Sequence, residues 1–353
     1  MVPIVLVRGL LRESGHWQSI LDELTQSSSN VITVTPNVPG NGEKFGEFSP
    51  LTIEGMLPAM LEQGYNKSLA AGTVCAVGTL GILIPPSIVL VIYAILTEQN
   101  IIKMFSAALL PGILAALGYM FVIWLQARFG RNPAQLAPRA SYGQRFRTLL
   151  GTWPVFAIFA IVIGGIYVGF FTPTEAAGMG AAASVLIAIA LRTMSWGDFL
   201  TATFDSVRAT AMIFAVIIGA ELFSNFVNFA GLPDALATLV LDLEMPVWAV
   251  ILIIIVIYMI LGCVLESLSM VLLTVPVFFP TIMALDFGLM PEQQAMWFGI
   301  ISLVVVELGL ITPPVGMNLF VISAMAKEIS MTQIFRGTLP FISAEFVRIV
   351  ILI

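Results

Sequence analysis

Residues 306–318 read VELGLITPPVGMN, and they place two adjacent prolines and two glycines inside one of the most apolar parts of the chain. Proline removes a backbone donor and glycine weakens a helix, so this apolar segment is predicted to be a broken helix. A second stretch, TLGILIPPSIV at residues 79–89, has the same pattern. A shift of 228 positions matches Leu80, Gly81, Pro85 and Pro86 with Leu308, Gly309, Pro313 and Pro314.

The composition is that of a membrane protein. Of the 353 residues, 59% are hydrophobic and 10% are charged, whereas soluble domains carry about 25% charged residues. The net charge of −6 offers no basic surface for nucleic acid. Cys75 and Cys263 lie in distant apolar segments, so we expect two reduced, buried thiols. The single histidine, His16, leaves little room for histidine-based catalysis or metal binding.

Residues 1–55 differ from the rest of the chain, because they hold nine of its charged residues and have soluble patterning. A short apolar run, a stretch with helical spacing and a second run before a turn-rich loop predict the start of an α/β domain. The motifs VLVRGLLRESGHW, NVPGNGE and SPLTIEGM resemble the beginning of an α/β-hydrolase. No G-x-S-x-G motif follows, so we expect this fragment to be incomplete and non-catalytic, and the chain not to be an enzyme.

Residues 56–353 read as a series of hydrophobic spans, judged against the roughly 20 apolar residues that cross a bilayer. The predicted helices are 68–83 with 87–97, 107–127, 151–171, 173–191, 208–228, 246–262 with 270–285, 295–311 with 315–326, and 339–353. Five arginines place the loop 128–150 in the cytoplasm, and the acidic loop 230–245 is predicted to face out.

This topology runs the two proline-broken segments in opposite directions. Similar sequences in opposite orientation indicate an inverted-repeat secondary transporter, in which discontinuous helices meet near the middle of the membrane. The similarity continues where MFSAALLPG at 104–112 parallels IFRGTLPF at 334–341. Unwound backbone is tolerated at membrane depth where it lines a site, so the breaks are the predicted site, and simple proline kinks are the alternative.

Five motifs in order over residues 56–353 carry a family resemblance: LPAMLEQGY, AAGTVCAVGTLGILIPPSIVLVIY, GGIYVGFFTPTEAAGMGA, LGCVLESLSMVLLTVPVFFP and LGLITPPVGMNLFV. Together they resemble the large permease subunit of the tripartite ATP-independent periplasmic (TRAP) transporters. The resemblance implies an all-α, multi-pass protein of the bacterial inner membrane that works as a sodium-coupled elevator. It implies import of organic acids such as C4-dicarboxylates or sialic acid. It also implies two partners, a periplasmic substrate-binding protein and a small membrane subunit.

The same resemblance implies a substrate and sodium site between two broken helices and two re-entrant hairpins, with sodium as the coupling ion and no other cofactor. The first broken helix contributes Gly81, Pro85, Pro86 and Ser87, and the second contributes Gly309, Thr312, Pro313, Pro314, Gly316 and Asn318. The second hairpin is 246–285, and its tip from Gly262 to Ser269 contributes Gly262, Glu266, Ser267 and Ser269. Backbone and hydroxyl oxygens near Ser87, Thr312 and Gly316 are the expected sodium ligands, because hard oxygen ligands suit an alkali cation.

Several of these residues also have a structural interpretation. Glu266 could lie at a tip that reaches water, and the Ser87 hydroxyl could bond the carbonyls freed by the break. The TPTE motif at 172–175 is predicted to be a helix-capping box. Glu307, just before the second break, is left without a role.

Three functions remain in competition. A TRAP-type permease is favoured. The second is an inactive, truncated or fused permease remnant. In this interpretation the hydrolase-like fragment replaces most of the first hairpin and leaves only its return limb, LPAMLEQGYNKSLAAGTV, and the chain ends within a span. A membrane-anchored hydrolase is the third.

Overall fold

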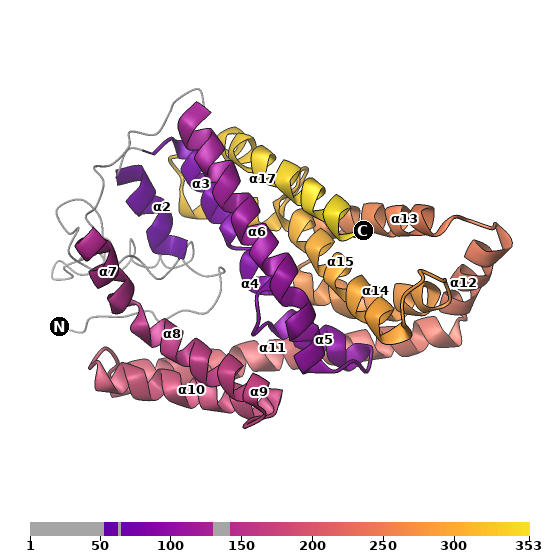
Figure 1. Ribbon diagram of the computed structural model, residues 1–353, viewed down its shortest axis with the longest axis horizontal. Helices are drawn as coiled ribbons and strands as arrows, with labels where there is room; N and C mark the ends of the chain where they lie inside the picture. Colours follow the sequence, from indigo (N-terminus) through magenta and orange to yellow (C-terminus); the bar gives the residue numbers. More distant parts are fainter. Residues whose placement is uncertain (1–52, 63–64, 130–141) are drawn as a thin grey trace, which may run out of the picture.

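The structure is a computed structural model, and it describes residues 53–62, 65–129 and 142–353. Within these residues every regular element is a helix, as predicted for an all-α membrane protein (Figure 1). The helices are α2 (Ile53–Glu62), α3 (Lys67–Val77), α4 (Leu80–Leu83), α5 (Ile88–Leu96), α6 (Ile101–Phe129), α7 (Tyr142–Gly151), α8 (Trp153–Phe159), η2 (Ala160–Gly164), α9 (Gly165–Val168), α10 (Pro173–Ala190), α11 (Trp196–Phe229), α12 (Leu232–Asp242), α13 (Val247–Gly262), α14 (Ser267–Met283), α15 (Pro291–Ile311), α16 (Met317–Met325) and α17 (Met331–Leu352). The expected α/β fragment lies outside the described residues except for the start of α2.

Four of these helices, α6, α10, α11 and α15, are long and apolar enough to cross a membrane. The pair Lys67–Leu83 and Ile88–Leu96 passes the same test only when its two helices are taken together, and the pair bends by 41° at the break between them, as a broken span or a re-entrant loop does. With a rise of about 1.5 Å per residue, the 21 residues of α15 extend for about 32 Å, which matches the hydrocarbon thickness of a bilayer. The polytopic membrane fold predicted from the apolar segments is therefore confirmed.

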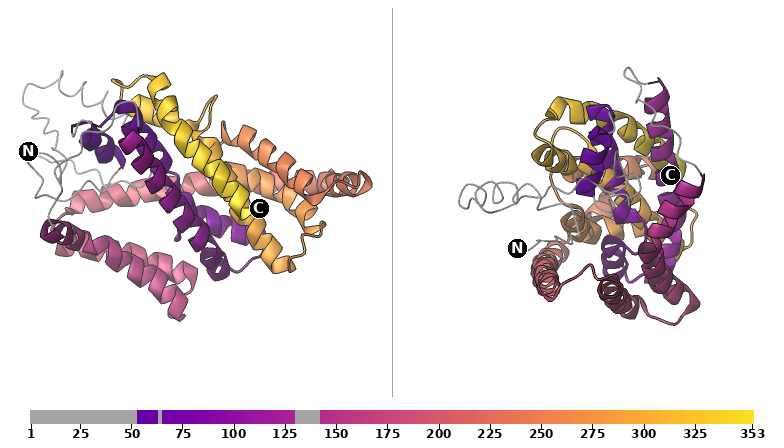
Figure 2. Two further views of the ribbon diagram at one scale, coloured as in Figure 1. Left: turned by 45° about the horizontal axis from the view of Figure 1, so that its top comes forward. Right: turned by 90° about the vertical axis from the view of Figure 1, so that its left-hand side faces the viewer.

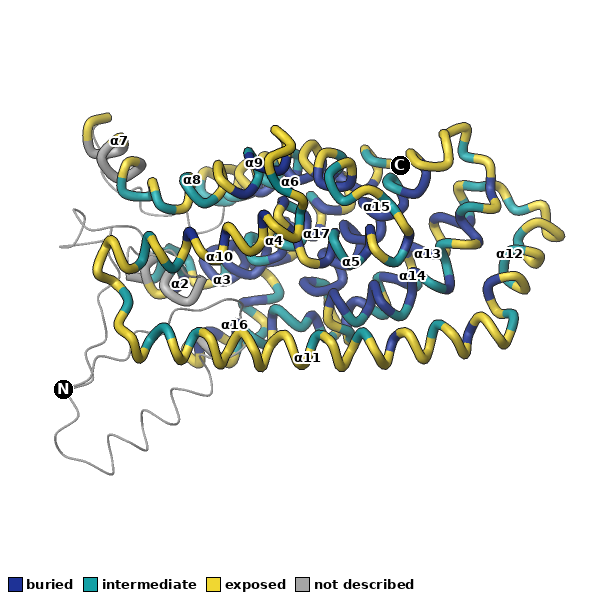
Figure 3. The backbone as a smooth tube through the Cα atoms, turned by 90° about the horizontal axis from the view of Figure 1, so that it is seen from below, coloured by how far each residue is buried: buried dark blue, intermediate teal, exposed yellow. Residues whose placement is uncertain are grey.

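Helix α15 is the centre of the molecule. In its most apolar window 89% of residues are buried, and α13, α14, α4, α6, α16 and α17 all pack against it. Figure 3 shows the buried backbone concentrated around α13, α14 and α15. Helix α17 runs beside α6 and along α3, so the second broken segment and the first are held in one core (Figure 2). The helices that lead into the duplicated proline motifs thus lie in this core, while Pro86, Pro313 and Pro314 themselves are exposed.

Helices α8, α10 and α11 form the periphery. Only 11% of the residues in the most apolar windows of α10 and α11 are buried, although those windows are as apolar as a membrane span. Figure 3 shows α11 as a mostly exposed helix that extends along one side of the molecule. These apolar surfaces face outward, where lipid or a partner would cover them.

Helix starts follow the local sequence. The Thr172 hydroxyl accepts from the Glu175 amide at 3.3 Å, and Glu175 accepts from the Thr172 amide at 2.8 Å, so the predicted capping box at α10 is confirmed. Ser195 and Asp198 form a second box that starts α11. Helix α11 therefore begins at Trp196, twelve positions before the predicted span 208–228.

Three loop predictions were wrong. The predicted loop 230–245 contains α12, and the end of the predicted loop 128–150 contains α7. The tip of the second hairpin is shorter than the predicted Gly262–Ser269, because α14 already begins at Ser267. The predicted span 151–171 is interrupted by the π-helix η2. In the three loop regions polar or acidic residues were interpreted as loop although they lie in helices, whereas η2 lies in an apolar segment that was correctly predicted to be helical.

Candidate functional site

The first break lies between α4 and α5. Ile84 is extended, with ψ of 119°, and the amide of Ile84 still bonds the carbonyl of Leu80. Ser87 is buried and caps α5: its hydroxyl donates to the Ile82 carbonyl and accepts from the Leu90 amide at 3.3 Å. The Ser87 hydroxyl thus satisfies backbone groups that the break sets free.

The second break joins α15 to α16. Thr312 is extended, with ψ of 134°, and its hydroxyl donates to the Leu308 carbonyl. Gly316 then turns the chain with φ of +59°, and a Cβ atom there would lie 2.7 Å from the Leu319 side chain. Both breaks share an extended residue followed by a cis Pro-Pro bond, at Pro85-Pro86 and Pro313-Pro314. The similarity of the two sequences therefore extends to their backbone conformation.

The hairpin α13–α14 meets the second break at its tip. A Cβ atom on Gly309 would lie 2.7 Å from the Cα atom of Gly262, so the two backbones touch where neither residue has a side chain. The Cys263 thiol lies 3.5 Å from the Thr312 carbonyl oxygen and 3.7 Å from that of Pro313. The carbonyl oxygens of Thr312 and Pro313, which make no helical hydrogen bond, thus share the Cys263 thiol as their donor. A thiol is a weak donor.

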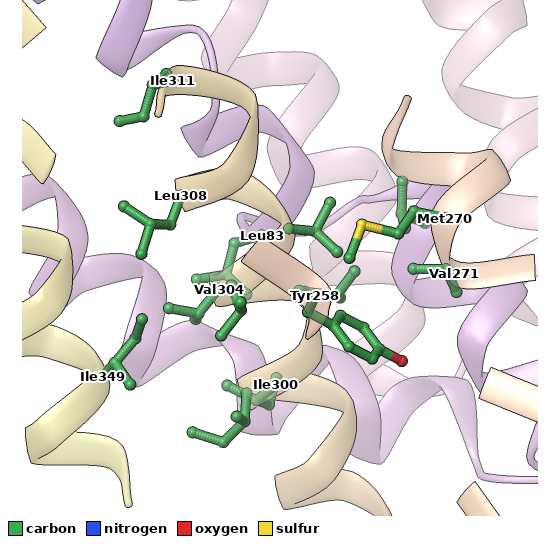
Figure 4. Packing of buried hydrophobic residues seen from close by; sticks show 14 of the residues in the cluster. Leu83, Tyr258, Met270, Val271, Ile300, Val304, Leu308, Ile311 and Ile349 are labelled. Atoms are coloured by element: carbon green, nitrogen blue, oxygen red, sulfur yellow. The ribbon is translucent and has the colours of Figure 1, made fainter. Parts of the chain in front are cut away.

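The first break reaches the same region through its flanking helices. Helix α4 packs on α15, and α5 packs on α14. Figure 4 shows Leu83 of α4 near Val304 and Leu308 of α15, with Met270 of α14 on the other side. The structure therefore brings both predicted broken helices and the hairpin into one cluster, although direct contact at the tip is made by the second break.

The polar residues of the tip differ in exposure. Glu266 is exposed and precedes α14, and the Ser269 hydroxyl lies 3.5 Å from its carboxylate. Ser267 is buried in the first turn of α14, and Asn318 is half-buried in the first turn of α16. Ser267 is thus the first residue of the helix that leaves the tip, and Asn318 is the second residue of the helix that leaves the second break. Gly81, in contrast, is exposed, and nothing approaches the position of its missing side chain within 4 Å.

The oxygen atoms of this cluster suit a hard, monovalent cation. The carbonyl oxygens of Thr312 and Pro313 lie between α15 and α16, outside either helix, and the Thr312 hydroxyl supplies a further oxygen beside them. Among the described residues, no group of three or more His, Cys, Asp and Glu side chains could hold a metal ion. The oxygens that the second break does present are the backbone carbonyls of Thr312 and Pro313 and the Thr312 hydroxyl.

Sequence reasoning missed two features of this region. Cys263 is a free, buried thiol as predicted, but its position against the second break was not expected. Glu307, which had no assigned role, binds Arg348 of α17. Arg348 and Glu345 are charged residues within an apolar span, and such residues are rare enough to have been a usable signal.

Comparison with known proteins identifies the family. The model of the tripartite ATP-independent periplasmic transporter, DctM component, matches residues 52–353. The chain belongs to the DctM family. The TRAP resemblance of the five motifs is thereby confirmed, and so is the prediction that the chain is not an enzyme.

Curated DctM relatives match most of the chain. The C4-dicarboxylate TRAP transporter large permease protein of Pseudomonas aeruginosa is 36% identical over 308 residues, which cover 86% of this chain and 70% of the relative. The protein of the same name from Rhodobacter capsulatus is 34% identical over 299 residues, or 79% of this chain and 66% of the relative. The sialic acid TRAP transporter large permease protein of Vibrio cholerae is 29% identical over 292 residues, or 82% of this chain and 66% of the relative.

Proposed function

We propose that the chain is the membrane permease subunit of a sodium-coupled secondary transporter that imports an organic acid, with a C4-dicarboxylate as the first candidate. The contact of the hairpin tip with the second break, at Gly262 and Gly309, is the observation that supports it most. Two re-entrant or broken elements that meet at membrane depth create the unwound backbone on which secondary transporters bind ions and substrates. The proposed location is the inner membrane of a bacterium.

In this proposal the backbone of the second break binds sodium. The carbonyls of Thr312 and Pro313 accept from the Cys263 thiol, so a cation could displace that weak contact at little cost. Gly316 allows the sharp turn that directs this backbone, and the Thr312 hydroxyl adds an oxygen beside it. The Ser87 hydroxyl, which is engaged with Ile82 and Leu90, would contribute at the first break through its remaining lone pair.

Substrate and partners are further parts of the proposal. Relatives whose names specify C4-dicarboxylates and sialic acid support an organic acid as the cargo. The exposed apolar faces of α10 and α11 offer a surface that a small membrane subunit or lipid could cover, and a periplasmic binding protein would deliver the substrate. The elevator-type movement, in which the hairpin and breaks carry the substrate across, is proposed on the same family grounds.

Sodium binding tests the proposal directly. We would measure thermal unfolding of the detergent-purified chain in sodium chloride and in choline chloride at equal ionic strength. A ligand that binds only the folded state stabilises it by RT ln(1 + [L]/Kd), about 2.7 kcal/mol at a hundredfold excess over Kd. We expect a rise in unfolding temperature that is specific to sodium and is reduced in Thr312→Val.

Uptake into vesicles by the chain together with its partner subunits then tests transport. Sodium-dependent uptake of a C4-dicarboxylate would support the full proposal. A chain that is folded but gains no stability from sodium, and shows no uptake, would instead favour a non-transporting permease remnant.

A further inference from the structure

A buried ionic cluster lies in the core beside the two breaks. Arg348 of α17 places one guanidinium nitrogen, Nη2, 2.8 Å from the Glu307 carboxylate of α15 and also binds Glu345 with that nitrogen. All three side chains are at most 4% exposed. Charges in an apolar interior persist only when they are paired, so these three residues depend on one another.

The cluster extends from Arg348 to the segment that carries the first break. The Tyr119 hydroxyl of α6 lies 3.4 Å from the Thr79 hydroxyl and is a near neighbour of the Glu345 carboxyl group. Thr79 is fully buried and immediately precedes α4. Glu307 lies beside the backbone of Leu83, the last residue of α4. A continuous polar path therefore joins the residues before the first break to those before the second.

The members of this path occupy matching positions in the two similar segments. The shift of 228 that matches Pro85 with Pro313 also matches Thr79 with Glu307. A shift of 229 matches Pro111 of α6 with Pro340 of α17, and it matches Tyr119 with Arg348. Each segment thus supplies one polar residue ahead of its break and one from the second helix after the break, and all four lie in the core.

We propose that Arg348 is a positioning residue that couples the two proline breaks. It holds Glu307, five residues before Thr312, and through Glu345 and Tyr119 it holds the segment before Pro85. A displacement at one break then changes the pairing of buried charges at the other, which is costly in an apolar interior. The proposed coupling between the two breaks does not depend on the proposed transport function. Only the role of this coupling during transport rests on that function.

The alternative is that the cluster merely stabilises α17 against α15 and transmits nothing. A native reporter separates the two, because Cys263 lies against the carbonyls of the second break. The chain has two cysteines, and the other, Cys75, can be replaced by alanine. The labelling rate of Cys263 by N-ethylmaleimide in the detergent-purified Cys75→Ala chain then reports opening at the second break.

The test alters Tyr119 or Arg348, two members of the polar path, and measures the labelling rate of Cys263 at the second break. We expect Tyr119→Phe and Arg348→Lys each to raise the labelling rate several-fold. Tyr119→Phe removes one hydroxyl and keeps the ring, which packs on Phe341 at 5.5 Å, so the fold is preserved even if Arg348→Lys fails to fold. Arg348→Lys keeps the charge but changes the length and shape of the side chain that brings one nitrogen, Nη2, to both carboxylates.

Two control variants exclude general loosening as the cause. Trp297→Phe removes the 2.8 Å hydrogen bond from the Trp297 indole to the Leu352 carbonyl, a second link between α15 and α17 outside the cluster. Lys103→Met removes the exposed ion pair of Lys103 with Glu292, which joins α6 to α15. Both variants should leave the labelling rate of Cys263 at the parent value, even if they lower the unfolding temperature.

The proposal is overturned if Tyr119→Phe and Arg348→Lys lower the unfolding temperature while Cys263 reacts at the parent rate. It is also overturned if Trp297→Phe accelerates labelling as much as Tyr119→Phe does. The assay uses no sodium, substrate or partner subunit, so a chain that fails to transport still gives a clear answer about the coupling.

Discussion

The backbones of Gly262 and Gly309 are in contact: a methyl group on Gly309 would lie 2.7 Å from the Cα atom of Gly262. This contact fixes the tip of the hairpin against α15 three residues before the second break. A movement of the hairpin tip away from α15 would separate these two glycines.

Gly309→Ala should therefore destabilise the fold and weaken the response to sodium. An added methyl at this contact meets backbone rather than a flexible side chain, and overpacking of this kind costs about 1–3 kcal/mol. Thermal unfolding with and without sodium measures both effects. Gly81→Ala is the matched control, because Gly81 occupies the equivalent position of the first segment and meets nothing within 4 Å. Equal destabilisation by the two variants would contradict the close contact.

Gly316→Ala tests the turn of the second break. The residue has φ of +59°, and its Cβ would lie 2.7 Å from the Leu319 side chain and 3.1 Å from the Thr312 carbonyl oxygen. Left-handed backbone costs a side chain about 1–2 kcal/mol, to which the contact with Leu319 adds. We expect a lower unfolding temperature and a reduced sodium effect. The double variant Gly316→Ala with Leu319→Ala should recover part of the sodium effect. If it recovers none, the strain of the left-handed backbone alone accounts for the loss.

Ser87→Ala separates capping from ion binding at the first break. Loss of an N-cap side chain costs about 0.5–2 kcal/mol, so the unfolding temperature should fall in both sodium and choline. If the hydroxyl only caps α5, the difference between the two salts will be unchanged. A smaller difference would show that the Ser87 hydroxyl also binds the ion. Ser87→Thr, which keeps the hydroxyl, is the control.

Glu266→Gln tests whether the exposed carboxylate at the hairpin tip attracts the cation. The charge lies at the start of α14 and beside Ser269, so its loss should raise the sodium concentration at half-maximal stabilisation while changing stability in choline little. The midpoint should become less sensitive to ionic strength, since an exposed charge acts through a screened field. Glu292→Gln, on the exposed start of α15, should leave the midpoint unchanged.

Apolar pattern and proline spacing were sufficient to predict the core of the fold. The segment 295–311 was predicted as a helix, and α15 ends at Ile311 as expected because the chain cannot continue a helix into Pro313-Pro314. Its start at Pro291 was missed, since Glu292 and two glutamines make that turn polar. Helix α12 was missed for a similar reason, because its acidic residues suggested an outer loop.

The site was predictable in part. The motifs identified the breaks and the hairpin, but local sequence does not reveal that Cys263 faces Thr312 or that Arg348 reaches Glu307, 41 residues away. These contacts depend on how α13, α15 and α17 pack together. A charged residue in an apolar span indicates that a partner exists, while only the packing identifies the partner.

The length of α11 has a consequence for the surrounding lipid. Its 34 residues extend for about 51 Å, well beyond a hydrocarbon layer of about 30 Å. Tilt alone would need to exceed the usual range of 0–40°, so part of the helix must lie at headgroup depth. Its start, with Trp196 stacked on Phe199 and the polar pair Ser195 and Asp198, has the composition of an interfacial anchor. Helix α11 therefore extends beyond the hydrocarbon layer that α15, with its 21 residues, just crosses.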